Sequence, residues 1–185
     1  MNGRIRMVVT CGLLIALAVV SSWFIKVPMV PSAPYLTWHP ANVFVLFGTF
    51  AFGPIAGVII SIAAAILNGS SEGFIGVVMN GLAMTVLGFT CGLIYRLNKT
   101  RRGAVLALVV GSLVSTVVAC AVNYFWSYPA YGLPPSAVWV TALPFNLMKS
   151  LLDGVIVFAL YKYLSPLLHG REGFKAPTES DPRFL

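Results

Sequence analysis

Hydrophobic residues in this chain occur in long runs that are interrupted by short polar or proline-rich segments. A helix that crosses a bilayer needs about 20 mostly apolar residues, and most of the runs approach that length. Only two are clearly shorter, and they adjoin each other. The pattern predicts a polytopic membrane protein made of helices. The apolar runs are residues 7–25, 41–52, 54–67, 74–95, 104–126 and 139–161.

The segment 41–67 is either one kinked helix or two elements joined by a tight turn, because each half is short for an upright span. The charges decide between these alternatives. With two crossings and a cytoplasmic N-terminus, every Lys and Arg except Lys26 and Lys149 lies inside or in the cytoplasmic tail, as the positive-inside bias requires. A single crossing would place the basic cluster 96–102 outside. We therefore expect an even number of passes, which a re-entrant hairpin would also give, and both termini in the cytoplasm.

Aromatic and proline residues mark the outer face of this topology. Tryptophan favours the membrane interface, and all four tryptophans fall at the outer ends of predicted elements. Prolines crowd the outer connections 27–40 and 127–138, which stiffens them into extended or turn geometry and suits a shaped lid. We expect one membrane domain over residues 1–168 and a polar cytoplasmic tail over 169–185.

Composition excludes several classes of protein. Apolar residues make up 58% of the chain and charged residues only 9%, which leaves no room for a soluble catalytic domain. The net charge of +7 is scattered in clusters beside apolar runs, so it reports topology and not nucleic-acid binding. Cys11, Cys91 and Cys120 lie in three separate runs, and we interpret them as packing residues instead of metal ligands or disulfide partners.

The last apolar run contains the only two ionisable residues inside predicted spans, Lys149 and Asp153. Such residues are costly in a bilayer and suggest function. Asn146 precedes them at a spacing that puts all three on one helical face. The pair either forms a structural ion pair or contributes to a ligand site. Because Asn146 and Lys149 lie toward the outer half, we favour the ligand site.

Two further asparagines, Asn80 and Asn123, also fall in helical runs. Each is either interhelical glue or, with Asn146, part of an outward-facing cavity, because an amide both donates and accepts hydrogen bonds and suits a neutral heterocycle. Nearby aromatic residues would either anchor the interface or stack on such a ring. These aromatic residues are Trp38, Tyr124, Phe125 and Trp126.

Small residues four apart allow close helix approach, as in Gly57 with Ser61 and Gly88 with Gly92. The pair Gly12 and Ala16 in the first run either packs the bundle or meets a partner protein. Motifs for catalysis are missing from the sequence, which has no phosphate-binding GxxxxGK[ST], no HExxH and no metal-spaced His or Cys cluster. We therefore expect no enzyme activity, no cofactor and no metal, and any pumping must draw energy from another chain.

Several stretches together resemble the riboflavin-binding S component of energy-coupling factor (ECF) transporters, over about residues 7–168. The most specific stretch ends the last outer loop and starts the final helix. The matching stretches are Tyr35-Leu36-Thr37-Trp38-His39-Pro40, Gly53-Pro54-Ile55-Ala56-Gly57, Gly76-Val77-Val78-Met79-Asn80, Asn123-Tyr124-Phe125 and Leu143-Pro144-Phe145-Asn146-Leu147-Met148-Lys149.

The resemblance implies an all-α, six-helix bundle in the cell membrane that captures riboflavin from outside. It implies a transmembrane coupling protein and two ATPases as partners, with Gly12 and Ala16 at the docking face. It also implies that Asn146 and Lys149 contact the flavin ring while other residues complete the site. These are Asn80 and Asn123 in the wall, Tyr124 beside them, and Leu36, Thr37 and Trp38 in the lid.

The chain departs from the family pattern in two places. His39 stands where many relatives have an acidic residue, and Ala64-Ala65 stand where they often have Lys-Asn. An S component for another vitamin or a flavin derivative is therefore the alternative within transport. A membrane scaffold without a ligand is the alternative outside it, although a scaffold would not need Lys149 in the membrane.

Overall fold

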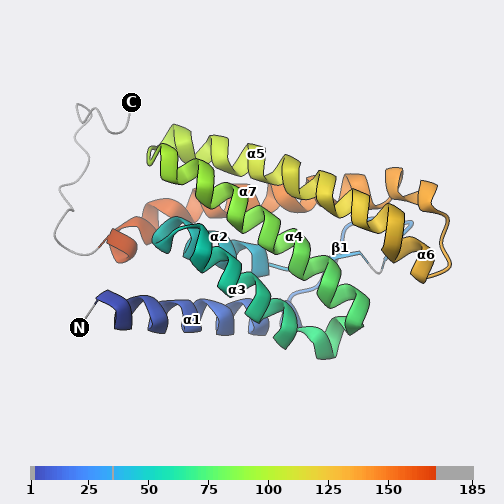
Figure 1. Ribbon diagram of the computed structural model, residues 1–185, viewed down its shortest axis with the longest axis horizontal. Helices are drawn as coiled ribbons and strands as arrows, with labels where there is room; N and C mark the ends of the chain where they lie inside the picture. The colour runs from blue at the N-terminus through green and yellow to red at the C-terminus, as the bar shows by residue number, and fades with distance from the viewer. Residues whose placement is uncertain (1–2, 35, 170–185) are drawn as a thin grey trace.

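The computed structural model describes residues 3–34 and 36–169, so the polar tail predicted over 169–185 lies almost wholly outside them (Figure 1). Six α-helices of more than three residues run side by side along the described part of the chain (Figure 1). They are α1 (Gly3–Phe24), α2 (Ala41–Phe52), α3 (Pro54–Leu67), α4 (Gly69–Leu97), α5 (Arg101–Val122) and α7 (Ala142–His169). The predicted all-helical, six-helix architecture is confirmed.

Four stretches of the described residues are long and apolar enough to cross a membrane, whereas α2 and α3 are shorter apolar helices. The four stretches are Ile5–Phe24, Gly73–Leu97, Arg101–Ala130 and Pro135–Leu160. Helix α4 starts earlier than its apolar run because a helical turn precedes Gly73, whose φ of 70° kinks the helix. The prediction of a multi-pass membrane protein holds.

Helices α2 and α3 are separate elements, which decides between the alternatives left open for residues 41–67. Gly53 joins them with φ 95°, a conformation that favours glycine, and Pro54 occupies the first turn of α3. This junction packs tightly on α4. A Cβ placed on Gly92 would lie 2.6 Å from the Cα atom of Pro54, so the close approach expected at Gly92 is present.

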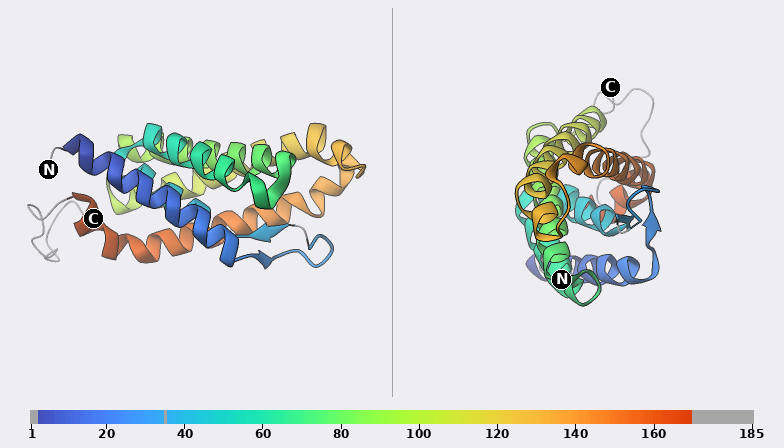
Figure 2. Two further views of the ribbon diagram at one scale, coloured as in Figure 1. Left: turned by 90° about the horizontal axis from the view of Figure 1, so that it is seen from below. Right: turned by 90° about the vertical axis from the view of Figure 1, so that its right-hand side faces the viewer.

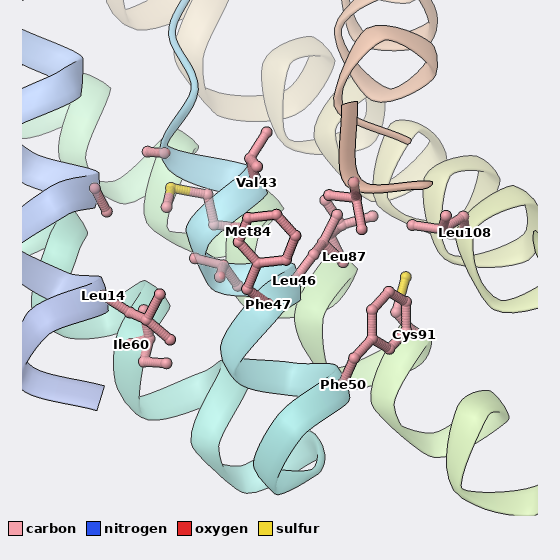
Figure 3. Packing of buried hydrophobic residues seen from close by; sticks show 14 of the residues in the cluster. Leu14, Val43, Leu46, Phe47, Phe50, Ile60, Met84, Leu87, Cys91 and Leu108 are labelled. Atoms are coloured by element: carbon pink, nitrogen blue, oxygen red, sulfur yellow. The ribbon is translucent and has the colours of Figure 1, made fainter. Parts of the chain in front are cut away.

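The core lies between α1, α2, α3, α4 and α5, with α7 closing one side (Figure 3). Leu46 and Phe47 of α2 are buried at its centre, and Cys91 of α4 donates through its Sγ to the carbonyl of Ala107 on α5 at 3.2 Å. All three cysteines are free, as the prediction of packing residues requires. Ala64 and Ala65, which depart from the family pattern, are 0% and 4% exposed. These two residues therefore contribute to core packing.

Short elements gather at one end of the bundle. Strand β1 (Val27–Pro28) pairs antiparallel with β2 (Thr37–Trp38), a ladder that the proline-rich sequence did not predict. A π-helical turn (Asn123–Ser127), the short helix α6 (Tyr128–Ala130) and a 3₁₀ turn (Pro135–Trp139) connect α5 to α7. Figures 1 and 2 place β1, β2 and α6 at the end opposite the start of α1, the α4–α5 connection and the end of α7.

This arrangement gives a direct test of membrane orientation. We expect Lys99, in the α4–α5 connection, to face the cytoplasm and Ser32, in the β1–β2 connection, to face outside, since both residues are exposed at opposite ends. Single cysteines at the two positions are introduced in a background without the three native cysteines. An impermeant thiol reagent added to intact cells should label position 32 and not position 99. Labelling of position 99 from outside would reverse the topology.

Candidate ligand-binding site

A cavity of about 620 Å³ opens among the short elements and the adjoining helix ends. That volume lies within the roughly 300–1,000 Å³ of small-molecule sites. Its polar lining includes side chains from six different elements or connections of the chain. These residues are Lys26 after α1, Thr37 of β2, Asn80 of α4, Asn123 of the π turn, Tyr131 after α6 and Asn146 of α7. The fold thus joins the three asparagines that the sequence singled out.

Two of these asparagines are held by their own helices. The Nδ2 atom of Asn123 donates to the carbonyl of Ala119 at 2.8 Å, and that of Asn146 donates to the carbonyl of Ala142 at 2.8 Å. Each amide is thereby fixed in rotation, and its oxygen is available as an acceptor. A ligand with N–H or O–H donors fits such a pair.

Lys149 lies directly behind the cavity wall and is 5% exposed. Its Nζ atom donates to the Oδ1 atom of Asn80 at 3.2 Å and lies 5.7 Å from the centroid of the Phe145 ring, within the range of a cation–π contact. Asn80 and Phe145 both line the cavity. The lysine therefore orients one polar wall and places a positive charge beside the site.

Aromatic side chains line the cavity, although not those that the sequence suggested. Tyr128 and Phe145 form part of the wall, and the Tyr128 hydroxyl lies 2.6 Å from the Oγ1 atom of Thr141. Since Thr141 uses its own hydrogen toward the carbonyl of Ala137, Tyr128 is the donor. Tyr124 is 38% exposed and stacks edge-on with Phe125, and it does not line the cavity.

The π turn explains why Tyr128, and not the predicted Tyr124, lines the cavity. In a π turn the hydrogen bond joins residues five apart, and the backbone N–H of Tyr128 donates to the carbonyl of Asn123. Tyr128 therefore follows Asn123 onto the cavity wall. The α-helical spacing assumed from sequence did not reveal this, since it contains no signal for a π turn.

Other lining residues did carry a sequence signal. Ile75, Met79 and Ala83 repeat every four residues along α4, which places them on one face beside Asn80. Phe145 directly precedes Asn146 within the most specific stretch of the sequence. Lys26 also lines the cavity, although its sequence context indicates only membrane topology and no site.

The β1–β2 connection contributes one edge of the cavity and is held from behind. Leu36 and Thr37 line the cavity. The next residue, Trp38, points elsewhere, because its Nε1 atom donates to the Oδ1 atom of Asp153 at 2.8 Å. Asn42 donates from Nδ2 to the other carboxylate oxygen of Asp153 at 2.7 Å. Asp153 thus has hydrogen-bond partners that the proposed pairing with Lys149 did not foresee.

His39, the departure from the family pattern, links this connection to α1. Its Nδ1 atom lies 3.3 Å from the hydroxyl of Ser22, and Ser22 donates its own hydrogen to the carbonyl of Ala18 at 2.6 Å. The proton of this contact therefore belongs to Nδ1 of a neutral imidazole. Burial, with the positive charges of Lys149 and Lys26, lowers the pKa of His39 to about 3.

This shift predicts that acid destabilises the protein. In the unfolded chain His39 takes up a proton near its ordinary pKa of 6.5, whereas the folded protein resists protonation until about pH 3. The contribution of neutral His39 to the free energy of unfolding is therefore fully present above pH 6.5. Below pH 6.5 it falls, by up to about 1.4 kcal/mol for each pH unit. We expect the melting temperature in detergent to drop between pH 7.5 and pH 5.0. The drop should shrink in His39→Gln and persist in His169→Gln, and an equal drop in all three proteins would contradict this account.

The first helix presents a separate feature at its surface. Gly12 and Ala16 are exposed, and a Cβ on Gly12 would meet no atom within 4 Å. Leu14 and Ala18, on the other side of α1, are buried in the core. Gly12 and Ala16 therefore do not pack the bundle, which was one of the two alternatives for this pair.

Comparison with known proteins decides the family. A family model described as "ECF transporter, substrate-specific component" matches residues 6–161. The chain is an ECF transporter S component. It is accordingly a transport protein and not an enzyme, and as an S component it works with an ECF module.

Relatives and a solved structure agree with this assignment. The riboflavin transporter RibU of Staphylococcus aureus is 29% identical over 91% of this chain and 98% of its own length. The riboflavin transporter FmnP of Bacillus subtilis is 24% identical over 74% of this chain and 80% of its own length. A structure described as the S component of a bacterial ECF transporter is 31% identical, with a TM-score of 0.80 over 90% of this chain and 99% of that one.

Proposed function

We propose that this S component captures riboflavin from outside the cell for ATP-driven uptake by an ECF module. The observation that carries the proposal is the cavity lined by Asn80, Asn123 and Asn146 and backed by Lys149. Relatives that are riboflavin transporters, similar over most of the chain, support the same substrate.

The polar groups match the edge of a flavin ring. That edge carries carbonyl oxygens, ring nitrogens that accept and one N–H that donates. In the proposed arrangement the N–H faces the oxygen of a tethered amide, Asn146 or Asn123, while the amide of Asn80, oriented by Lys149, supplies donors for the carbonyl oxygens. Pairing both kinds of group in a partly enclosed cavity favours this ring over a purely hydrophobic ligand.

The remaining walls suit the rest of the molecule. Phe145 and Tyr128 provide flat surfaces beside the asparagines, and an aromatic ring stacks or packs edge-on against such groups. Leu36 and Thr37 would form the lid, with Trp38 as its anchor on the bundle. Tyr124 has no place in this arrangement because it does not line the cavity.

The same proposal covers orientation and partners. With both termini in the cytoplasm, the cavity opens outward, where substrate arrives. A transmembrane coupling protein and two ATPases would then supply the energy, and the exposed face of α1 at Gly12 and Ala16 would dock on the coupling protein through close helix approach.

Fluorescence titration tests the substrate directly. Free flavin fluoresces strongly, and stacking on protein aromatics quenches it, so added protein should quench riboflavin fluorescence to saturation at equimolar ratio. Thiamine and biotin should not displace the bound flavin, since neither carries the same polar edge. Displacement by either vitamin at similar concentration would replace riboflavin with that vitamin as the substrate.

A further inference from the structure

Asp153 is fully buried in the middle of α7, at 0% exposed. A carboxylate inside a membrane bundle is costly unless donors surround it. Both of its oxygens are satisfied, one by the indole N–H of Trp38 at 2.8 Å and the other by the amide of Asn42 at 2.7 Å. Neither donor belongs to α7, so the carboxylate joins this helix to another part of the chain.

The two donors flank the lid of the cavity. Trp38 ends strand β2, and Asn42 lies in the first turn of α2. Successive residues of a strand point to opposite sides. Thr37 therefore faces the cavity while Trp38 faces α7, and the hydrogen bond of Trp38 holds the strand that carries Thr37.

Among the described residues, the side chain of Asn42 makes its hydrogen bond to Asp153 through its donor group only. It is 5% exposed, and its Oδ1 atom is buried without a hydrogen-bond partner. A buried amide oxygen left unpaired is unfavourable. The residue is thus stabilised through its donor group alone, and that group is directed at Asp153.

We propose that Asp153 is a positioning residue that latches the lid, holding Trp38 and Asn42 so that β2 stays closed over the cavity. It touches no ligand itself. Opening the lid requires breaking the hydrogen bond from Trp38 to a buried charge that Asn42 holds in place, so the latch sets the rate at which a ligand leaves. The kinetic part of this inference rests on the proposed riboflavin function, whereas the latch itself does not.

The latch is tested first without any ligand. Trp23, Trp126 and Trp139 are exposed, so replacing all three with Phe leaves Trp38 as the sole tryptophan. Asp153→Asn keeps the size of the side chain but turns one acceptor into a donor. We expect acrylamide to quench Trp38 fluorescence several-fold more strongly in Asp153→Asn, because the freed lid exposes the indole. Asp153→Leu has a similar size and removes both acceptors, and unchanged quenching in both variants would overturn the latch.

The effect on ligand is measured by stopped-flow release. Loss of a hydrogen bond to a charged group should raise the dissociation rate of riboflavin about tenfold or more, with the association rate changed much less. Trp38→Phe removes only the indole donor and should raise the dissociation rate in the same direction. If Asp153→Asn does not fold, Trp38→Phe and Asn42→Ser give the same test.

Coupling separates a latch from a general loss of stability. In a Trp38→Phe background, Asp153→Asn should add less to the dissociation rate than it does alone, because the shared hydrogen bond is already gone. Ser61→Ala is the matched control. It removes a partly buried hydrogen bond between α3 and α4 and should lower the melting temperature without changing the dissociation rate.

The outcomes are distinguishable from failure of the proposed function. If the wild-type protein binds no riboflavin, the proposed substrate is wrong, and the quenching of Trp38 alone decides the latch. If riboflavin binds but Asp153→Asn and Trp38→Phe act additively on dissociation, the latch is wrong and the substrate stands. Equal effects of Ser61→Ala on dissociation would also overturn the latch.

Discussion

Replacing Lys149 with Met is expected to weaken riboflavin binding roughly ten- to a hundredfold while the protein still folds in detergent. The substitution keeps the length of the side chain and removes the donor that holds Asn80 at 3.2 Å. The Oδ1 atom of Asn80 then loses its hydrogen bond from Lys149, and the wall that faces the ligand loses a donor and a positive charge, which costs about 1 to 3 kcal/mol. Titration by quenching of flavin fluorescence measures the change.

Lys99→Met is the control for this experiment, because Lys99 is an exposed lysine in the α4–α5 connection. That connection lies at the end of the bundle opposite β1 and α6 (Figure 1). Asn146→Leu should weaken binding to a similar extent, since Asn146 lines the cavity. Unchanged affinity in Lys149→Met, with normal folding, would return Lys149 to a purely structural role.

The second large effect is expected on uptake. Gly12→Trp or Ala16→Trp should reduce riboflavin uptake about tenfold or more in cells that also make the coupling protein and ATPases, because tenfold corresponds to only about 1.4 kcal/mol of lost docking energy. Binding by the isolated S component should stay unchanged. Both residues are exposed, so a bulky side chain would obstruct a partner helix and not the bundle.

Leu13→Trp provides the comparison for this pair. Leu13 is also exposed, but one residue along a helix turns the side chain by about 100°, away from the stripe of small residues. Uptake should survive this change. A parallel loss of binding and uptake in Gly12→Trp would show that the residue matters for folding and not for docking.

The helices could be predicted from sequence because membrane helices depend on composition and length. The bounds Ala41–Phe52 and Pro54–Leu67 match the apolar runs, since Gly53 provides the positive φ and Pro54 the helix start at their junction. The pairing of β1 with β2 escaped prediction because two-residue strands leave no periodicity.

Part of the site could be predicted because polar side chains in a membrane carry a free-energy cost and therefore suggest function. Asn80, Asn123, Asn146 and Lys149 are expensive in a membrane, and the fold brings all four to the same cavity or directly behind it. Aromatic residues carry no such cost at the interface, so their position gave no comparable signal. Which tyrosine lines the cavity depends on the π turn, which brings Tyr128 and not Tyr124 to the cavity wall.

The hydrogen-bond partners of Asp153 could not be predicted from the spacing of residues along its own helix. Sequence distance favoured Lys149, four residues away on the same helix. The hydrogen bonds from Trp38 and Asn42 span 115 and 111 residues, and only the three-dimensional packing of α2 on α7 brings them together. The same holds for His39, whose contact with Ser22 explains how an imidazole is accommodated beside the lid.

The absorbance spectrum of the purified protein tests the central claim most directly. The protein is produced in cells supplied with riboflavin and purified in detergent at neutral pH, where His39 is neutral. We predict a yellow preparation with flavin absorbance, from which acid releases riboflavin in near-equimolar amount, and a colourless preparation from Lys149→Met after the same washing. A colourless wild-type protein that also fails to quench added riboflavin would contradict the account.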